Sequence, residues 1–309
     1  MDREVPSKKI YVGGQAVIEG VMMRGPEYVA TAVREPGGGI VVKKTKVSSL
    51  SARFPLLKKP MLRGMVALYE SLLIGMKSLM FSAQAAGEEE EALSDREIYM
   101  TMAFSTLFAI VLFLAIPTYA AKFIPGLAGH PLAMNLAEGV IRLVIFLAYL
   151  YGISLTKDIQ RVFEYHGAEH KTIFCYEKNL PMTVDNVRVQ PRLHPRCGTN
   201  FLLMVVVISI FVFAFLGWPS LWERIVSRVL LMPVVAGLAY EWIRMAAETT
   251  NPILQALVRP GLWLQLITTR EPHDDQIEVA IRALEEAKPT EEAAETASAK
   301  EVTGAYVAG

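Results

Sequence analysis

The residue types that most often bind metals or act in catalysis are concentrated between Tyr165 and Cys197. His166 and His170 are four residues apart, so on a helix their rings lie on one face and can bind one metal ion. Glu169 follows His166 by three residues, close enough to orient a water molecule or to join the site. The H-x-x-E-H pattern is that of inverted zinc peptidases. This segment therefore predicts a site for a divalent metal ion, with zinc the favoured one.

A second cluster follows directly, because His194 and Cys197 are also good zinc ligands. Together with His166 and His170 they can give four ligands, as in a structural zinc site. They can also give three ligands and an open position, as in a catalytic site. The sequence does not choose between these two arrangements.

In the catalytic interpretation, Glu169 is the general base for a water molecule that the metal activates, and the reaction is a hydrolysis. Arg192 and Arg196 are candidates for holding an anionic group of the substrate, although solvated charge is the commoner role of such residues. Inverted peptidases take a further carboxylate from far downstream. Glu241 and Glu248 are the residues of this chain that could return to the site.

Two other interpretations remain open. Cys197 follows Arg196 and stands where an apolar helix begins, and both features favour a thiolate nucleophile with His194 or His170 as its base. Cys175 lies in an apolar context and is expected to be an inert packed residue. In the other alternative, the protein is a membrane scaffold or accessory subunit, and four filled ligand positions make the metal purely structural.

Composition restricts the class of protein. The chain has 309 residues, of which 52% are apolar and 20% charged, and its 31 basic residues balance 31 acidic ones. Zero net charge argues against a nucleic-acid partner, and the low charge argues against a disordered chain. Two cysteines are too few for a disulfide framework and fit a reducing compartment.

Apolar segments predict a mainly α-helical, polytopic membrane protein with about four transmembrane helices. The runs Ile98–Ala121 and Gly198–Trp222 carry no charge and exceed the roughly 20 residues that a bilayer core requires. Gly139–Thr156 and Ile225–Ile243 are weaker candidates. Arg142 is expected to snorkel from the end of its span. No span interior contains an acidic residue except Glu241 near an end, which makes transport the weakest hypothesis.

The charge of one loop predicts the orientation in the membrane. Seven basic residues lie between the second and third spans, namely Lys157, Arg161, Lys171, Lys178, Arg188, Arg192 and Arg196. The positive-inside rule places this loop in the cytoplasm, and four spans then place both termini there. The expected location is the cell membrane, with the lipid bilayer as partner and with membrane-protein partners or a homo-oligomer as further possibilities.

The remaining segments predict a small cap. Tyr28–Arg34 and Ile40–Val47 are expected to form a β-hairpin, preceded by a tight turn in the glycine-rich stretch Gly13–Gly20. Met61–Ala86 is expected to be an amphipathic helix that lies along the membrane or packs against the spans. A fifth, partly buried span is the less favoured alternative.

After the last span, Trp263 is expected to anchor an interfacial segment. Asp274 or Asp275 is expected to cap a short amphipathic helix.

The sequence divides the chain into seven predicted segments. They are 1–60, a cytosolic region with the hairpin; 61–97, the amphipathic helix and an acidic linker; 98–156, the first pair of spans; 157–197, the cytosolic His/Cys loop; 198–243, the second pair of spans; 244–287, cytosolic or interfacial helices; and 288–309, a disordered tail.

Four separated motifs resemble the YqhQ family of bacterial membrane proteins. They are Gly14–Gly25, His166–Lys171, His194–Thr199 and Pro260–Pro272, and they occur in the same order. The resemblance covers roughly residues 8 to 287. It implies a bacterial inner-membrane protein and a predicted metal-dependent enzyme. The matching motif positions that it carries over, without a demonstrated role, are His166, Glu169, His170, His194 and Cys197.

Overall fold

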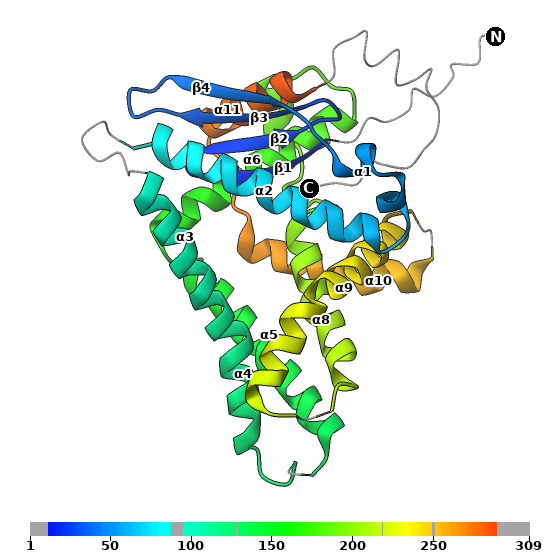
Figure 1. Ribbon diagram of the computed structural model, residues 1–309. Coiled ribbons are helices and arrows are strands. Elements are labelled where there is room, and N and C mark those ends of the chain that lie inside the picture. The colour runs from blue at the N-terminus through cyan, green and yellow to red at the C-terminus, as the bar shows by residue number, and fades with distance from the viewer. Residues whose placement is uncertain (1–11, 88–94, 128, 218, 249–250, 289–309) are drawn as a thin grey trace, which may run out of the picture.

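The computed structural model describes residues 12–87, 95–127, 129–217, 219–248 and 251–288. A cap that contains the β-sheet lies at one end of a group of long helices (Figure 1). Both the first strands and the last helix of the described chain belong to this cap. The predicted tail lies outside the described residues except for Lys288, which follows the last helix, and so does the predicted acidic linker except for its last residues.

The cap is built on a four-stranded antiparallel sheet in the order β1-β2-β3-β4. Its strands are β1 (Gly13–Val17), β2 (Gly20–Arg24), β3 (Tyr28–Arg34) and β4 (Ile40–Lys46). The predicted hairpin is confirmed as β3 and β4. The glycine-rich stretch contains the predicted turn, at Ile18 and Glu19, but it also supplies β1 and the start of β2, which the sequence analysis missed.

Helices cover both faces of the sheet, so the cap has three layers (Figure 1). On one face, Val21 and Met23 pack with α6 (Lys157–Glu177) and α11 (Asp274–Ala287). On the other face, Met22 packs with α2 (Leu62–Ala85). The alternation of side chains along β2 therefore joins both helical layers to one strand.

Among the described residues, four helices are long and apolar enough to cross a membrane, in agreement with the predicted number of about four: Leu62–Ala85, Tyr99–Phe123, Pro131–Ile153 and Leu221–Met245. The set differs from the predicted one, because α2 qualifies by length and composition and Gly198–Ala214 (α8) is shorter. In the fold, however, α2 lies across the long helices, between them and the sheet (Figure 1). α2 packs against the sheet on one side and against α9 (Leu221–Glu248) on the other.

The long helices include α3 (Asp95–Ile110), continued by a π-helical turn (Val111–Ala115) and α4 (Ile116–Ala120), α5 (Pro131–Ile153) and α9. The short helices are α1 (Leu50–Arg53), α7 (Val184–Arg188) and the 3-10 helices Pro55–Lys58 and Ala121–Phe123. α8 ends at Ala214 rather than near Trp222, so it is about 25 Å long. Gly217 adopts a left-handed conformation with φ 69°, and Pro219 follows it, so the helix cannot continue.

The expectation that Arg142 snorkels is wrong, because its side chain is buried between helices. Pro117 has no N–H, which leaves the carbonyl of Phe113 without its helical donor. The Arg142 Nε donates to this carbonyl over 2.9 Å, and its other end pairs with Glu138. Since α5 begins at Pro131, Glu138 lies inside a spanning helix, which also corrects the expectation that the spans lack an interior acid apart from Glu241.

α2 and α9 meet at a close joint. A Cβ on Gly64 would lie 3.0 Å from the Cα of Gly237, so both glycines permit the approach. Glu241 accepts hydrogen bonds from the Arg63 guanidinium and from the backbone N–H of Met61. Glu241 therefore joins two helices and is not a further carboxylate of the metal site. The side chain of Glu248, the other candidate, lies outside the described residues.

The C-terminal helices lie where the cap meets the long helices. In α10 (Pro252–Thr268), the Trp263 side chain is 65% exposed, as an anchor in the membrane interface would be. α11 begins after His273, whose backbone N–H donates to Gln276 over 2.9 Å. The predicted cap residues Asp274 and Asp275 are instead in the first turn. The expected apolar face of this helix is buried: Ile277, Ala280, Ile281 and Leu284.

The joint between α2 and α9 makes a testable prediction. Glu241→Gln replaces the carboxylate that holds Arg63, and the loss of charge-assisted hydrogen bonds should cost about 1–3 kcal/mol. Thermal unfolding of the detergent-solubilised protein should show a lower midpoint. Glu223→Gln on the same helix is the matched control, because its carboxylate bonds to the neighbouring Ser220. Equal midpoints for the two variants would show that the joint contributes nothing.

Candidate metal centre

The fold brings His166, His170 and Cys197 into one group. Each offers a ligand atom, and these atoms all lie within 4.8 Å of one another. The Nε2 of His166 is 3.2 Å from the Cys197 sulfur. In a tetrahedral zinc site with bonds of about 2.0–2.3 Å, neighbouring ligand atoms are about 3.3–3.8 Å apart. Three of the predicted ligands are therefore close enough for one ion.

Backbone carbonyls hold both imidazole rings from behind. The Nδ1 of His166 is 2.8 Å from the carbonyl of Thr268, and the Nδ1 of His170 is 2.5 Å from the carbonyl of Arg192. Since a carbonyl accepts, each Nδ1 carries the proton. Each Nε2 is then unprotonated and carries a lone pair, which is the arrangement that metal-binding histidines adopt.

The donor atoms fit a metal ion. The His170 Nε2 is buried and has no hydrogen-bond partner among the residues that the structure describes. Burial lowers the pKa of His170, so the ring stays neutral and its lone pair stays available. At the N-terminus of α8, the Cys197 sulfur accepts a hydrogen bond from the backbone N–H of Thr199 over 3.4 Å, so the sulfur is fixed beside both rings.

Glu169 lies beside this group and is buried. Its Oε2 is 3.9 Å from the His166 Nε2, and desolvation raises its pKa. Strand β1 lies close to the Glu169 side chain, since a Cβ on Gly14 would lie 2.8 Å from the Cγ of Glu169. A carboxylate with a raised pKa can hold or release a proton nearer to neutral pH than an exposed glutamate.

His194 lies next to the group, but its ring is used differently. Its centroid is 5.6 Å from that of His170. The Nδ1 accepts from the backbone N–H of Arg196 over 3.3 Å, so the proton is on Nε2, which lies 3.6 Å from a Glu177 carboxylate oxygen. Burial lowers the pKa of His194 to about 4. His194 is thus outside the group of three.

The two arginines predicted to hold substrate have partners within the chain. Arg192 donates to the hydroxyl of Thr269 over 3.1 Å, and its Nε lies 3.6 Å from the carboxylate of Glu271. Arg196 pairs with Glu177. Glu271 is exposed, whereas Glu177 is largely covered. Arg192 is therefore the arginine whose carboxylate partner a solvent-borne anion could replace.

Gly167 makes the site possible by allowing close contact. A Cβ at this position would lie 2.0 Å from the carbonyl of Arg270, so a side chain would push α6 away from the segment that follows α10. The same approach places Thr268 against His166. Gln265 fixes the His194 backbone through two hydrogen bonds of 2.8 Å. Sequence reasoning assigned no role to Thr268 or Gln265; their only signal was that they lie in the Pro260–Pro272 motif.

The four motif segments thus meet at one place, where the cap joins the helices. The fold is that of a helical membrane protein, and its sheet-containing cap carries a His/Cys group. The family model described as "Protein of unknown function (DUF1385)" matches residues 59–290. The "Uncharacterized protein YqhQ" of Bacillus subtilis (strain 168) is 39% identical over 290 residues, which cover 89% of this chain and 91% of that protein. The chain belongs to this family, and no solved structure matches it.

A substitution at Gly167 should disturb the site without changing a ligand. We expect Gly167→Ala to lower stability by about 1–3 kcal/mol, because the added Cβ overlaps the Arg270 carbonyl. Zinc retained after purification should fall together with the thermal midpoint. Gly152→Ala is the matched control, since this helical glycine has open space where the Cβ would lie. Full zinc retention by Gly167→Ala would contradict the proposed contact.

His194 makes a prediction about pH. Its folded pKa of about 4 lies below the unfolded value of 6.5, so acid protonates the unfolded chain first. The stability due to its neutral ring is complete above pH 6.5 and is lost as the pH falls towards 4, by up to about 3 kcal/mol. We expect chelator-treated wild type to lose more stability on acidification than His194→Asn, which keeps an acceptor for the Arg196 N–H. Parallel pH curves would contradict this.

Proposed function

We propose that this protein is a metal-dependent hydrolase that acts where its cap meets the membrane, with a zinc-like ion held by His166, His170 and Cys197. One observation carries the proposal. Two carbonyls from separate parts of the chain fix both imidazoles in the tautomer that a metal requires, and both rings face one sulfur. The fold therefore already orders both imidazoles, and metal binding does not have to orient them.

The donor set favours zinc over a hard cation, because two imidazoles and a thiolate suit zinc whereas magnesium and calcium take oxygen ligands. Three protein ligands leave one coordination position open, as catalytic zinc sites do. When bound, the ion would act as a Lewis acid and lower the pKa of water towards about 7.

Glu169 is the proposed general base. It belongs to the same helix as both histidines, and its Oε2 lies 3.9 Å from the His166 Nε2. Burial raises its pKa, so the carboxylate can take a proton from the attacking water and return it to the leaving group. Gly14 has no side chain, so the Glu169 side chain lies directly against strand β1, and this close contact limits its rotamers.

We also propose that the cap lies in the cytoplasm, because the basic segment that contains the site belongs to it. Both termini then face the cytoplasm in a multi-pass protein of the cell membrane. Arg192 is the proposed contact for an anionic group of the substrate, such as a carboxylate or a lipid phosphate, in exchange for the exposed Glu271. Arg196, whose partner is largely covered, is proposed to hold the His194 segment in place.

A structural metal site is the second candidate, and burial favours it. His170 is 1% exposed and Cys197 9% exposed, and the group ties α6 to the start of α8. An ion there would hold the cap onto the long helices whether or not it took part in a reaction. Thiol chemistry at Cys197 is the interpretation that remains if no metal binds.

Metal content and two substitutions separate these possibilities. The protein purified in detergent without chelator should contain about one equivalent of zinc by mass spectrometry. His170→Ala should lose the metal, because it removes a ligand. Glu169→Gln should keep the metal and the thermal midpoint but should fail to complement a deletion strain.

The control for these variants is Glu164→Gln, on the same helix, whose carboxylate bonds to Gln276 outside the group. A wild-type protein without zinc would refute both metal hypotheses. If Glu169→Gln keeps the metal, the stability and the cellular function, the site is structural and the hydrolase proposal fails.

A further inference from the structure

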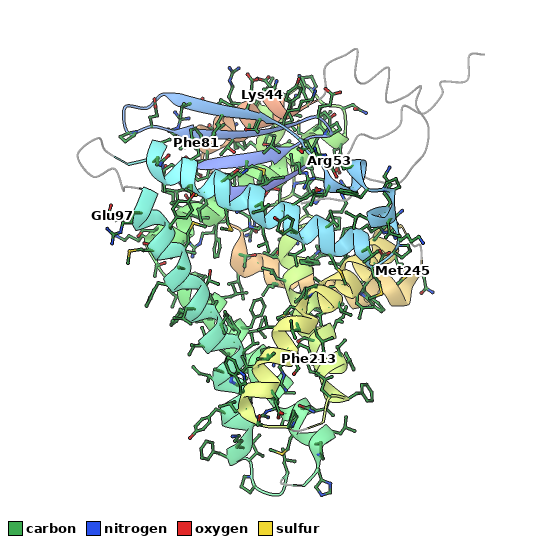
Figure 2. All side chains as sticks on the ribbon, in the orientation of Figure 1. Lys44, Arg53, Phe81, Glu97, Phe213 and Met245 are labelled. Atoms are coloured by element: carbon green, nitrogen blue, oxygen red, sulfur yellow. The ribbon has the colours of Figure 1, made fainter. Side chains whose placement is uncertain are left out.

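A second polar cluster lies inside the long helices, at the end away from the cap. The guanidinium groups of Arg142, Arg224 and Arg228 surround the carboxylate of Glu138 at 2.5, 3.9 and 2.7 Å. All four side chains are buried, with at most 6% of each exposed. Phe213, which packs against Arg142 and Arg228, is labelled in the lower half of the molecule in Figure 2.

Neighbouring helices hold these groups in place. Arg142 donates to the hydroxyl of Ser209 in α8 over 3.1 Å, and Arg228 donates to Asn135 in α5 over 3.1 Å. Thr118 in α4 donates to Glu138 over 3.0 Å. The cluster is therefore built from α4, α5, α8 and α9, and its geometry is fixed by contacts that do not depend on a ligand.

Among the described residues, positive charge exceeds negative charge in this cluster. Arg142 and Arg228 carry two positive charges, and the ion pairs of both are with the single carboxylate of Glu138. Arg224 lies 3.9 Å from the same carboxylate. Excess charge in a membrane interior is costly unless a counter-charge meets it. The Arg228 Nε is also buried without a hydrogen-bond partner among the described residues, so this guanidinium can donate further.

Aromatic residues show how deep the cluster lies. Tyr119, Phe123 and Trp222 are 55, 67 and 72% exposed at this end of the helices, as in an aromatic belt at a membrane interface. Along α9, Arg224 and Arg228 follow Trp222 by two and six residues, which correspond to about 3 and 9 Å. The arginines thus lie just inside the level of the lipid headgroups.

We propose that Arg142, Arg224 and Arg228 form a binding site for a phosphate-type oxyanion in the leaflet opposite the cap, supplied by an anionic phospholipid headgroup. Arginine matches the geometry of phosphate, and its charge-assisted hydrogen bonds are strong at low dielectric. A bound phosphate would balance the charge that Glu138 leaves uncompensated. Soluble phosphate offers the same chemistry, so the test must separate the two sources.

This site is separate from the metal group. Ser209 and Cys197 lie on the same helix, 12 residues or about 18 Å apart. Failure of either proposal therefore leaves the other intact.

The test measures binding of phosphatidylglycerol to the purified full-length protein by native mass spectrometry, with phosphatidylcholine as the neutral reference. A parallel arm follows the thermal midpoint with inorganic phosphate. Arg228→Gln should weaken phosphatidylglycerol binding about tenfold, because it removes one charge-assisted contact. Glu138→Gln should strengthen binding, because it removes the competing carboxylate. Arg282→Gln, on the exposed surface of the cap, should leave binding unchanged.

The sign of the Glu138→Gln effect is decisive even if Arg228→Gln does not fold. A structural network predicts that both substitutions destabilise the protein and that neither changes the preference for anionic lipid. That result, or equal binding of phosphatidylglycerol and phosphatidylcholine by wild type, would overturn the proposal. Stabilisation by inorganic phosphate that matches the effect of the lipid would support the oxyanion site and assign it to a soluble anion.

Discussion

The site depends above all on the contact between α6 and the chain segment after α10, which has the His166–Thr268 hydrogen bond at its centre. The contact exists because Gly167 presents no side chain to the Arg270 carbonyl. It fixes the tautomer and direction of one imidazole and also sets where α11 begins, since the same segment leads into that helix. α11 then covers the sheet together with α6. The shape of the cap and the orientation of the candidate ligands thus have one physical origin.

Polar contacts between helices take the place that the hydrophobic effect has in a soluble core. Lipid is as apolar as leucine, so apolar packing alone gives the long helices little reason to associate in one arrangement. Two groups of hydrogen-bonded charged residues, one beside the cap and one at the far end of the helices, favour one arrangement. Glu241 joins α2 to α9 beside the cap, and Glu138 with its arginines joins α5 and α9 at the far end. The carbonyl of Phe113 shows the same principle: Pro117 has no N–H to donate to it, and Arg142 from the neighbouring helix donates instead.

Sequence reasoning identified the helices, strands and residue spacings that depend on the local pattern of residue types. Apolar runs located the long helices, two β-rich runs joined by the Gly-rich connection Glu35–Gly39 located the β3–β4 hairpin, and the spacing of His166 and His170 placed both rings on one helical face. It could not identify what depends on distant contacts. Thr268 acts through its carbonyl, which every residue has, so its side chain gives no signal. His194 resembles a ligand in sequence, and only the N–H of Arg196 on its Nδ1 shows that its lone pair is used. Glu138 lay just outside a predicted span because the start of α5 contains polar residues that other helices satisfy.

α8 was predicted to be part of a spanning segment, but it is shorter than the length that a bilayer core requires of a spanning helix. Of its 17 residues, Gly198, Leu202 and Phe211 are exposed, and the others are at least partly covered by neighbouring helices. The requirement of roughly 20 apolar residues applies to a helix whose whole length faces lipid. Because α8 packs against α5, α9 and α10, most of its residues face protein rather than hydrocarbon, and the helix can stop after about 25 Å. It begins directly after Cys197, against the cap, and ends beside the buried arginines, so one rigid element sets the distance between the two polar sites.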